Sequence, residues 1–139
     1  MKIPVPYGHL HAKVWGSPGP NKLKVLAIHG WQDNAGSWDK LIPFLNYEEH
    51  LYVVAFDMTG HGLSSHLPQG VCYSEITFLL DIKRVLDYLK WNKVTIMAHS
   101  MGANISLQFA ATYPDLVERI VTIDTVKSRI CSSDVTASM

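Results

Sequence analysis

Polar and hydrophobic residues alternate near the start of the chain. Leu10, Ala12 and Val14 are separated by polar residues over the range 9–14. This period of two is typical of a strand with one face buried, most often in an antiparallel pair. Two prolines and a glycine in the range 17–21 then deny both a helix and regular strand pairing. We therefore expect an antiparallel strand followed by a loop.

Four later segments are almost continuously apolar and rich in β-branched residues: 25–28, 51–56, 94–98 and 120–123. Runs of this kind are typical of strands that are buried on both faces. The range 76–89 instead repeats its apolar residues with helical spacing. Alternating strands and helices predict an α/β fold, with a mostly parallel sheet and helices on both of its faces.

Length and charge narrow the possible functions. The chain has 139 residues, is 47% hydrophobic and balances 12 basic against 12 acidic residues, which predicts one globular domain and no electrostatic site for nucleic acid. We expect a domain over residues 1–127 and a polar, disordered tail over 128–139. No apolar run approaches the ~20 residues needed to cross a bilayer, and no secretory signal is evident. These features favour a small substrate that is neutral or modestly polar, no membrane, and a cytoplasmic location, with peroxisomal or perinuclear association left open.

The segment that carries the main chemical hypothesis lies at residues 94–103. A buried strand there leads through His99 and Ser100 directly into small residues and a helix. A serine on such a sharp strand-to-helix turn exposes its hydroxyl as a nucleophile, and Gly102 allows the helix to pack closely. Alanine stands at position 98, where the usual G-x-S-x-G pattern has glycine. The alternative interpretation of Ser100 is an ordinary helix N-cap.

Two further segments accompany this one in a fixed order. His29, Gly30 and Trp31 end the first buried strand, and a glycine-rich segment follows the second at 57–65. The glycine-rich segment does not fit a dinucleotide fingerprint, because serine replaces the third glycine and a turn follows in place of a helix. Together with Ser100, these motifs resemble the N-terminal half of an α/β-hydrolase, specifically the serine hydrolase-like subfamily.

The resemblance implies roles for particular residues. The backbone N–H groups of Trp31 and Met101 would form the oxyanion hole, and His29, Gly30, His99 and Gly102 would support the site. In this family the catalytic acid and histidine follow the serine in the chain. Asp124 is a weak candidate for the acid, but no histidine follows His99. We therefore expect a truncated α/β-hydrolase domain that lacks its last strands and its base, with an exposed sheet edge that favours self-association.

The other histidines favour structural roles. His29 and His61 are expected to fix loops, and His9 and His11 to be solvated on their strand, because no third metal ligand is evident beside them. No cofactor or metal is therefore expected.

Two functions remain after these steps. The first is a carboxylesterase-like serine hydrolase that acts on an ester or related acyl substrate through Ser100, with an incomplete triad in this chain. The second is a catalytically inactive binding or regulatory protein with the same fold. A dehalogenase or epoxide hydrolase is disfavoured, because those enzymes carry aspartate at the position of Ser100.

Overall fold

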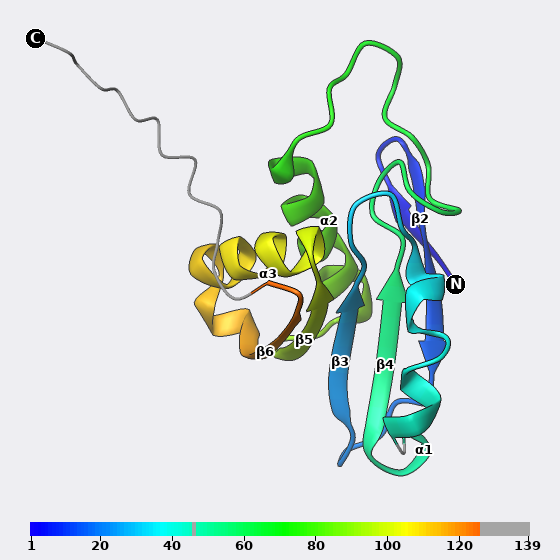
Figure 1. Ribbon diagram of the computed structural model, residues 1–139, viewed down its shortest axis with the longest axis vertical. Coiled ribbons are helices and arrows are strands. Elements are labelled where there is room, and N and C mark those ends of the chain that lie inside the picture. Colours follow the sequence, from blue (N-terminus) through cyan, green and yellow to red (C-terminus); the bar gives the residue numbers. More distant parts are fainter. Residues whose placement is uncertain (46, 126–139) are drawn as a thin grey trace, which may run out of the picture.

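A six-stranded mixed sheet forms the centre of the molecule. The computed structural model describes residues 1–45 and 47–125. The strands are β1 (Lys2–Val5), β2 (Gly8–Trp15), β3 (Leu23–Ile28), β4 (Leu51–Phe56), β5 (Val94–His99) and β6 (Val117–Ile123). Their order across the sheet is β1-β2-β4-β3-β5-β6 (Figure 1).

The helical elements lie between these strands. Two longer helices are α2 (Glu75–Leu89) and α3 (Met101–Thr112), and four short elements are η1 (Ala35–Trp38), η2 (Ile42–Leu45), α1 (Tyr47–His50) and η3 (Pro114–Leu116). The predicted α/β fold is thus confirmed. The sequence did not predict β1, which is only four residues long and contains Pro4.

The pairing of the strands determines where a ligand can bind. Strands β3, β4, β5 and β6 are parallel, whereas β2 is antiparallel to both of its neighbours. After β3 the chain passes to β4 on one side of it and then to β5 on the other side. In open α/β sheets, the crevice at the carboxyl ends of strands where the order reverses in this way is the usual binding site. The segments after β3 and β5 meet there.

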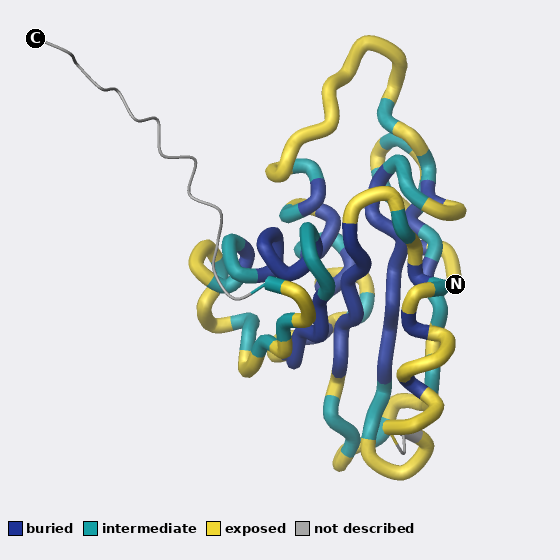
Figure 2. The backbone as a smooth tube through the Cα atoms, viewed as in Figure 1, coloured by how far each residue is buried: buried dark blue, intermediate teal, exposed yellow. Residues whose placement is uncertain are grey.

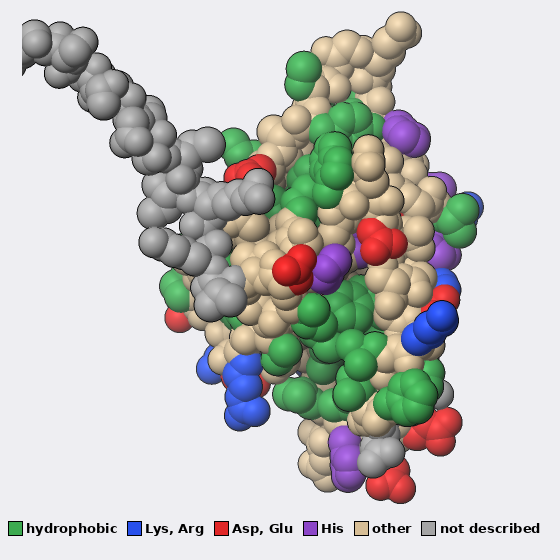
Figure 3. All heavy atoms as spheres, viewed as in Figure 1, with side chains coloured by type: hydrophobic (Ala, Val, Ile, Leu, Met, Phe, Trp, Pro, Cys, Tyr) green, Lys and Arg blue, Asp and Glu red, His purple; other side chains and the backbone are tan. Residues whose placement is uncertain are grey.

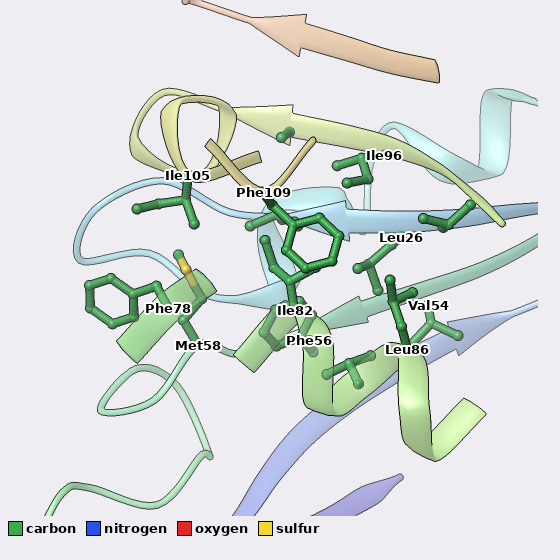
Figure 4. Packing of buried hydrophobic residues seen from close by; sticks show 14 of the residues in the cluster. Leu26, Val54, Phe56, Met58, Phe78, Ile82, Leu86, Ile96, Ile105 and Phe109 are labelled. Atoms are coloured by element: carbon green, nitrogen blue, oxygen red, sulfur yellow. The ribbon is translucent and has the colours of Figure 1, made fainter. Parts of the chain in front are cut away.

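Both longer helices cover the same face of the sheet. In Figure 4, Phe78 and Ile82 of α2 and Ile105 and Phe109 of α3 pack against side chains of β3, β4 and β5. The helical spacing at 76–89 is therefore confirmed. Ile76 within it is 68% exposed, however, because the buried stripe of α2 is centred on Phe78, Ile82, Val85 and Leu86.

Short helical elements cover the opposite face. Trp38 of η1 and Ile42 of η2 pack against Val53, Ala55 and Met97 of the sheet. Figure 2 shows the result, with β3 and β4 buried along most of their length between the two layers. The helices expected on both faces are present, but only one face carries long ones.

Two further expectations concern the C-terminal tail and membrane-spanning segments. The polar tail predicted at 128–139 lies outside the described residues. Among the described residues, no helix is both long and apolar enough to cross a membrane.

Candidate active site

Ser100 occupies a strained turn between β5 and α3. Its backbone has φ 49° and ψ −115°, a region that residues with a Cβ rarely adopt. The serine stands at the N-cap position of α3, but its side chain makes no capping hydrogen bond. An N-cap serine normally has extended backbone and uses its hydroxyl to accept from the first turn. The N-cap interpretation therefore fails, and the hydroxyl is not used to hold the helix.

The end of β6 holds this turn in place. The Ser100 N–H donates to the carbonyl of Ile123 over 3.0 Å, and the Thr125 hydroxyl donates to the carbonyl of Ser100 over 3.1 Å. Asp124 lies between these two residues, in an exposed bend with φ 59°. Among the described residues, no hydrogen bond joins its carboxylate to a histidine. The sequence analysis missed Thr125, because a single threonine after a strand carries no motif.

Two glycines allow the end of β3 to approach the turn. A Cβ on Gly102 would lie 2.4 Å from the carbonyl oxygen of His29, so only glycine lets α3 pack this closely on β3. A Cβ on Gly30 would lie 2.9 Å from the His99 ring and 3.4 Å from the Ser100 Cβ. The structure thus brings His29, Gly30, His99, Ser100 and Gly102 together. The His99 side chain lies against Gly30, as a wall of the site.

The two predicted oxyanion donors lie on either side of this contact. Trp31 directly follows Gly30, and Met101 directly follows Ser100 as the first residue of α3. Neither backbone N–H donates a hydrogen bond within the part of the chain that the structure describes. The N-terminus of α3 also carries the positive end of its dipole. Both groups are therefore free to bind a negatively charged oxygen.

His29 and His61 hold loops. His29 is fully buried, and its Nδ1 donates to the Gly30 carbonyl (2.7 Å) while its Nε2 accepts from the Met58 N–H (3.0 Å). Burial lowers the pKa of His29, which keeps the ring neutral. His61 Nδ1 donates to the Thr59 carbonyl over 3.1 Å. Within residues 1–45 and 47–125, no histidine hydrogen-bonds to the Ser100 hydroxyl.

Asp57 is a buried residue whose role the sequence analysis missed. Asp57 is 2% exposed as a residue. Its carboxylate accepts hydrogen bonds from the backbone N–H groups of Ala35 (2.6 Å) and Leu63 (2.8 Å). The His11 ring also contacts it, over 3.2 Å. The expectation of a solvated His11 was therefore wrong, because this strand histidine faces a buried carboxylate. Asp57 connects β2 with the loops that follow β3 and β4.

Asp81 performs a similar role from α2. It is fully buried, accepts from the Thr59 N–H over 2.9 Å and contacts Tyr7 and Arg84 over 2.9 and 3.1 Å. Burial raises the pKa of the Asp81 carboxyl despite these partners. The signal in the sequence was an acidic residue within the apolar stripe of a helix. Asp81 accepts from Thr59 and Asp57 accepts from Leu63, so the two carboxylates together hold the segment after β4 in place.

The structure also bears on metal binding. Among the described residues, no group of three or more His, Cys, Asp or Glu side chains is arranged to hold a metal ion.

Comparisons with known proteins agree with this geometry. Residues 25–137 match the family model described as alpha/beta hydrolase fold. The human "Serine hydrolase-like protein" is 47% identical over 126 residues, which are 90% of this chain and 60% of that protein. The hypothetical protein PA1622 from Pseudomonas aeruginosa PAO1 superposes with a TM-score of 0.85 at 35% identity, over 96% of this chain and 46% of that one.

A thioesterase domain from the curacin biosynthetic pathway is also similar, with a TM-score of 0.78 and 31% identity over 88% of this chain and 44% of that one. In each case the chain spans less than two thirds of the protein that it matches. The match to the family model covers most of the chain and includes both Ser100 and the segment after β3. The chain therefore belongs to the alpha/beta hydrolase fold family.

Proposed function

We propose that this chain carries the nucleophile half of a serine hydrolase that acts on an ester or related acyl group through Ser100. The observation that carries the proposal is the backbone of Ser100, at φ 49° and ψ −115°, with a hydroxyl that caps nothing. Strain of this kind persists only where the surrounding structure imposes it, and it is concentrated at functional sites. Similarity to a serine hydrolase-like protein and to a thioesterase domain supports acyl transfer.

The free groups around Ser100 suit the two steps of this reaction. The Ser100 Oγ would attack the acyl carbon, and the carbonyl oxygen would take up the negative charge facing the N–H groups of Trp31 and Met101. Collapse of this intermediate would break the bond to the alcohol and leave an acyl-serine, which water would then hydrolyse. A base must accept the serine proton and return it to the leaving alcohol.

The base is the part for which this chain offers no candidate. His29 uses both ring nitrogens in structural hydrogen bonds, and no histidine follows His99 in the sequence. Asp124, in the bend after β6, is proposed as the acid that would orient a histidine from elsewhere. We therefore expect the 139-residue chain to react slowly by itself.

Chemical rescue tests this proposal. Imidazole at high concentration should act as an external base and accelerate the labelling of Ser100 by a fluorophosphonate probe, as measured by peptide mass spectrometry. The variant Ser100→Ala controls for labelling at other hydroxyl groups. Labelling that is absent at Ser100 with and without imidazole would contradict the proposed function. Rapid labelling without imidazole would show that a base is present after all.

A second candidate is a binding protein that pairs with a second copy of itself through β6. Val121 and Ile123 of this strand are 51% and 38% exposed. Figure 3 shows further hydrophobic side chains gathered over the middle of the molecule on the face in view. No described strand pairs with the outer edge of β6. The opposite edge of the sheet, β1, is short and carries Pro4, which blocks pairing there.

Charges disfavour two registers of this pairing. The Ile123 carbonyl faces β5, so the N–H and C=O groups of Ile120 and Thr122 point outward. A two-fold pairing centred on Ile120 would place Arg119 opposite Val121, whereas centres at Glu118 or Arg119 would oppose like charges. Thr122→Pro removes an outward N–H while leaving the pairing with β5. It should convert a dimer into a monomer in sedimentation experiments, and a wild-type chain that is already monomeric would contradict this candidate.

A further inference from the structure

A pocket lined by aromatic rings lies beside the loop that follows β3. It has a volume of about 310 Å³, and five residues contribute rings to its wall: Trp31, His61, His66, Tyr73 and Phe78. Its lining residues come from the loop after β3, from the long segment that connects β4 to α2 and from α2 itself. Figure 1 shows both segments at the carboxyl ends of β3 and β4. Ser100 does not itself line the pocket. Trp31, which does, directly follows Gly30, and a Cβ on Gly30 would lie 3.4 Å from the Ser100 Cβ, so the loop that carries Trp31 joins the pocket to the turn at Ser100.

The rings support one another. His61 contacts Trp31 and Phe78 edge to face, with 5.7 Å between ring centroids in each pair. Tyr73 stacks on Phe78 with a centroid separation of 6.4 Å, and a Cβ on Gly60 would collide with the Tyr73 ring. Phe78 is buried in the core, so it anchors the group to α2. The wall is therefore held in place before any ligand arrives.

The remaining lining is polar and carries a single carboxylate. Among the described residues that line the pocket there is no aliphatic side chain, no lysine and no arginine, and Asp33 is the acidic group. The neighbouring Ser37 hydroxyl and the backbone N–H of Asn34, which donates to the Asp33 carboxylate over 2.9 Å, lower the pKa of this carboxyl, so that it stays ionised. A pocket for a plain alkyl chain would instead be expected to contain leucine, isoleucine or valine.

Electron-rich ring faces together with one carboxylate favour a particular class of ligand. An alkylated ammonium group is attracted to aromatic faces, most strongly to tryptophan, and its methyl groups contact the rings directly. Trp31 is 60% exposed, which is unusual for so large a ring and leaves its surface open to such a group. An anionic ligand would meet the Asp33 carboxylate, and the described lining residues include no lysine or arginine to attract it, only the histidines at 61 and 66.

We propose that this pocket binds a quaternary ammonium group, and that the substrate is an ester that carries such a group near its acyl bond. The second part rests on the hydrolase function proposed above. The first part concerns binding alone and does not depend on any reaction at Ser100.

Choline and 3,3-dimethylbutan-1-ol provide a matched pair of probes, because they have the same shape and differ in charge. Binding to the 139-residue chain at pH 8 and constant ionic strength can be followed by amide chemical shifts in ¹H–¹⁵N spectra. We expect choline to bind about tenfold more tightly than the neutral alcohol, which corresponds to about 1.4 kcal/mol. Equal or weaker binding of choline, or no binding of either probe, would overturn the proposal.

Three variants locate the effect in the pocket. Trp31→Leu removes the ring and should abolish most of the preference for choline, whereas Trp31→Phe keeps a ring and should retain most of it. Asp33→Asn should weaken choline binding several-fold without changing the affinity for the neutral alcohol. Thermal unfolding of each variant checks that the fold is intact, which the exposure of Trp31 leads us to expect. A preference that survives Trp31→Leu and Asp33→Asn would place the cation elsewhere and refute the assignment.

The two proposals can fail separately. Choline binding without imidazole-dependent labelling of Ser100 would support the pocket and contradict the hydrolase function. Labelling of Ser100 without any preference for choline would do the reverse.

Discussion

Replacing Ser100 by glycine should stabilise the protein, because it removes the Cβ that makes the turn strained. A residue with a Cβ at φ 49° and ψ −115° stores about 1–3 kcal/mol. Glycine offsets part of this stabilisation, because it makes the unfolded chain more flexible and so lowers the free energy of unfolding by about 0.5–1 kcal/mol relative to alanine. The net difference between Ser100→Gly and Ser100→Ala should be about 0.5–2 kcal/mol in favour of glycine.

The alanine variant is the matched control, because both variants lose the hydroxyl and only one keeps the Cβ. Ser100→Ala should stay within about 0.5 kcal/mol of the wild type. Urea unfolding followed by circular dichroism measures the free energies directly, and thermal unfolding should show glycine melting about 2–6 °C above alanine for a chain of this size.

A second control establishes what glycine does where there is no strain. Ala111 lies on the exposed side of α3, so Ala111→Gly should cost about 1 kcal/mol through helix propensity alone. If Ser100→Gly is no more stable than Ser100→Ala, the turn stores no strain and the main argument for a nucleophile at this position fails.

Three further predictions follow from the contacts around the site. Gly102→Ala should lower the free energy of unfolding in urea by about 1–3 kcal/mol, although alanine has the better helix propensity. Gly19→Ala should have no measurable effect, because a Cβ added at Gly19 makes only ordinary contacts. A stabilised Gly102→Ala variant would show that α3 can move off β3. Asp57→Asn should lower the free energy of unfolding by about 2–4 kcal/mol, because a buried acceptor of two backbone N–H groups is weakened. The same change at the exposed Asp39, which pairs with Lys13, should lower it by less than about 1 kcal/mol. Equal losses of stability in the two variants would refute the role of Asp57. Folding lowers the pKa of His29 from its usual 6.5, so the unfolded state binds the proton more readily than the folded state. The contribution of this residue to stability is therefore complete above pH 6.5 and should be lost as the pH falls below that value, at up to about 1.4 kcal/mol per pH unit. An NMR titration in which the His29 ring protonates at or above pH 6.5 would contradict this.

Periodicity and composition were sufficient for most of the fold. Apolar runs located β3, β4, β5 and β6, and helical spacing located α2, because backbone geometry imposes a period of two or 3.6 on any segment with a buried side. The strand β1 was missed, since four residues that include a proline carry too little pattern. The exposure of Ile76 was missed for a related reason, because the spacing defines a helix but not which stripe of it meets the sheet.

The site was predictable where it depends on local backbone. The strand–turn–helix segment at Ser100 and the glycines at 30 and 102 are visible in the sequence, because close approach and unusual backbone angles restrict the residues allowed there. Asp57 and Thr125 were not predictable in this way. Asp57 bonds to Ala35, 22 residues away, and Thr125 to Ser100, 25 residues away, and no local pattern records a hydrogen bond between distant segments.

The sequence by itself therefore determined the α/β class, the position of the sharp turn and the absence of a histidine after residue 99. Only the tertiary structure decided that the Ser100 hydroxyl caps nothing, that β6 holds the turn and that five rings from two loops and α2 line one pocket. The physical reason is that local angles and periodicity are properties of short segments, whereas burial, hydrogen-bond partners and pockets arise when segments distant in the chain pack against one another.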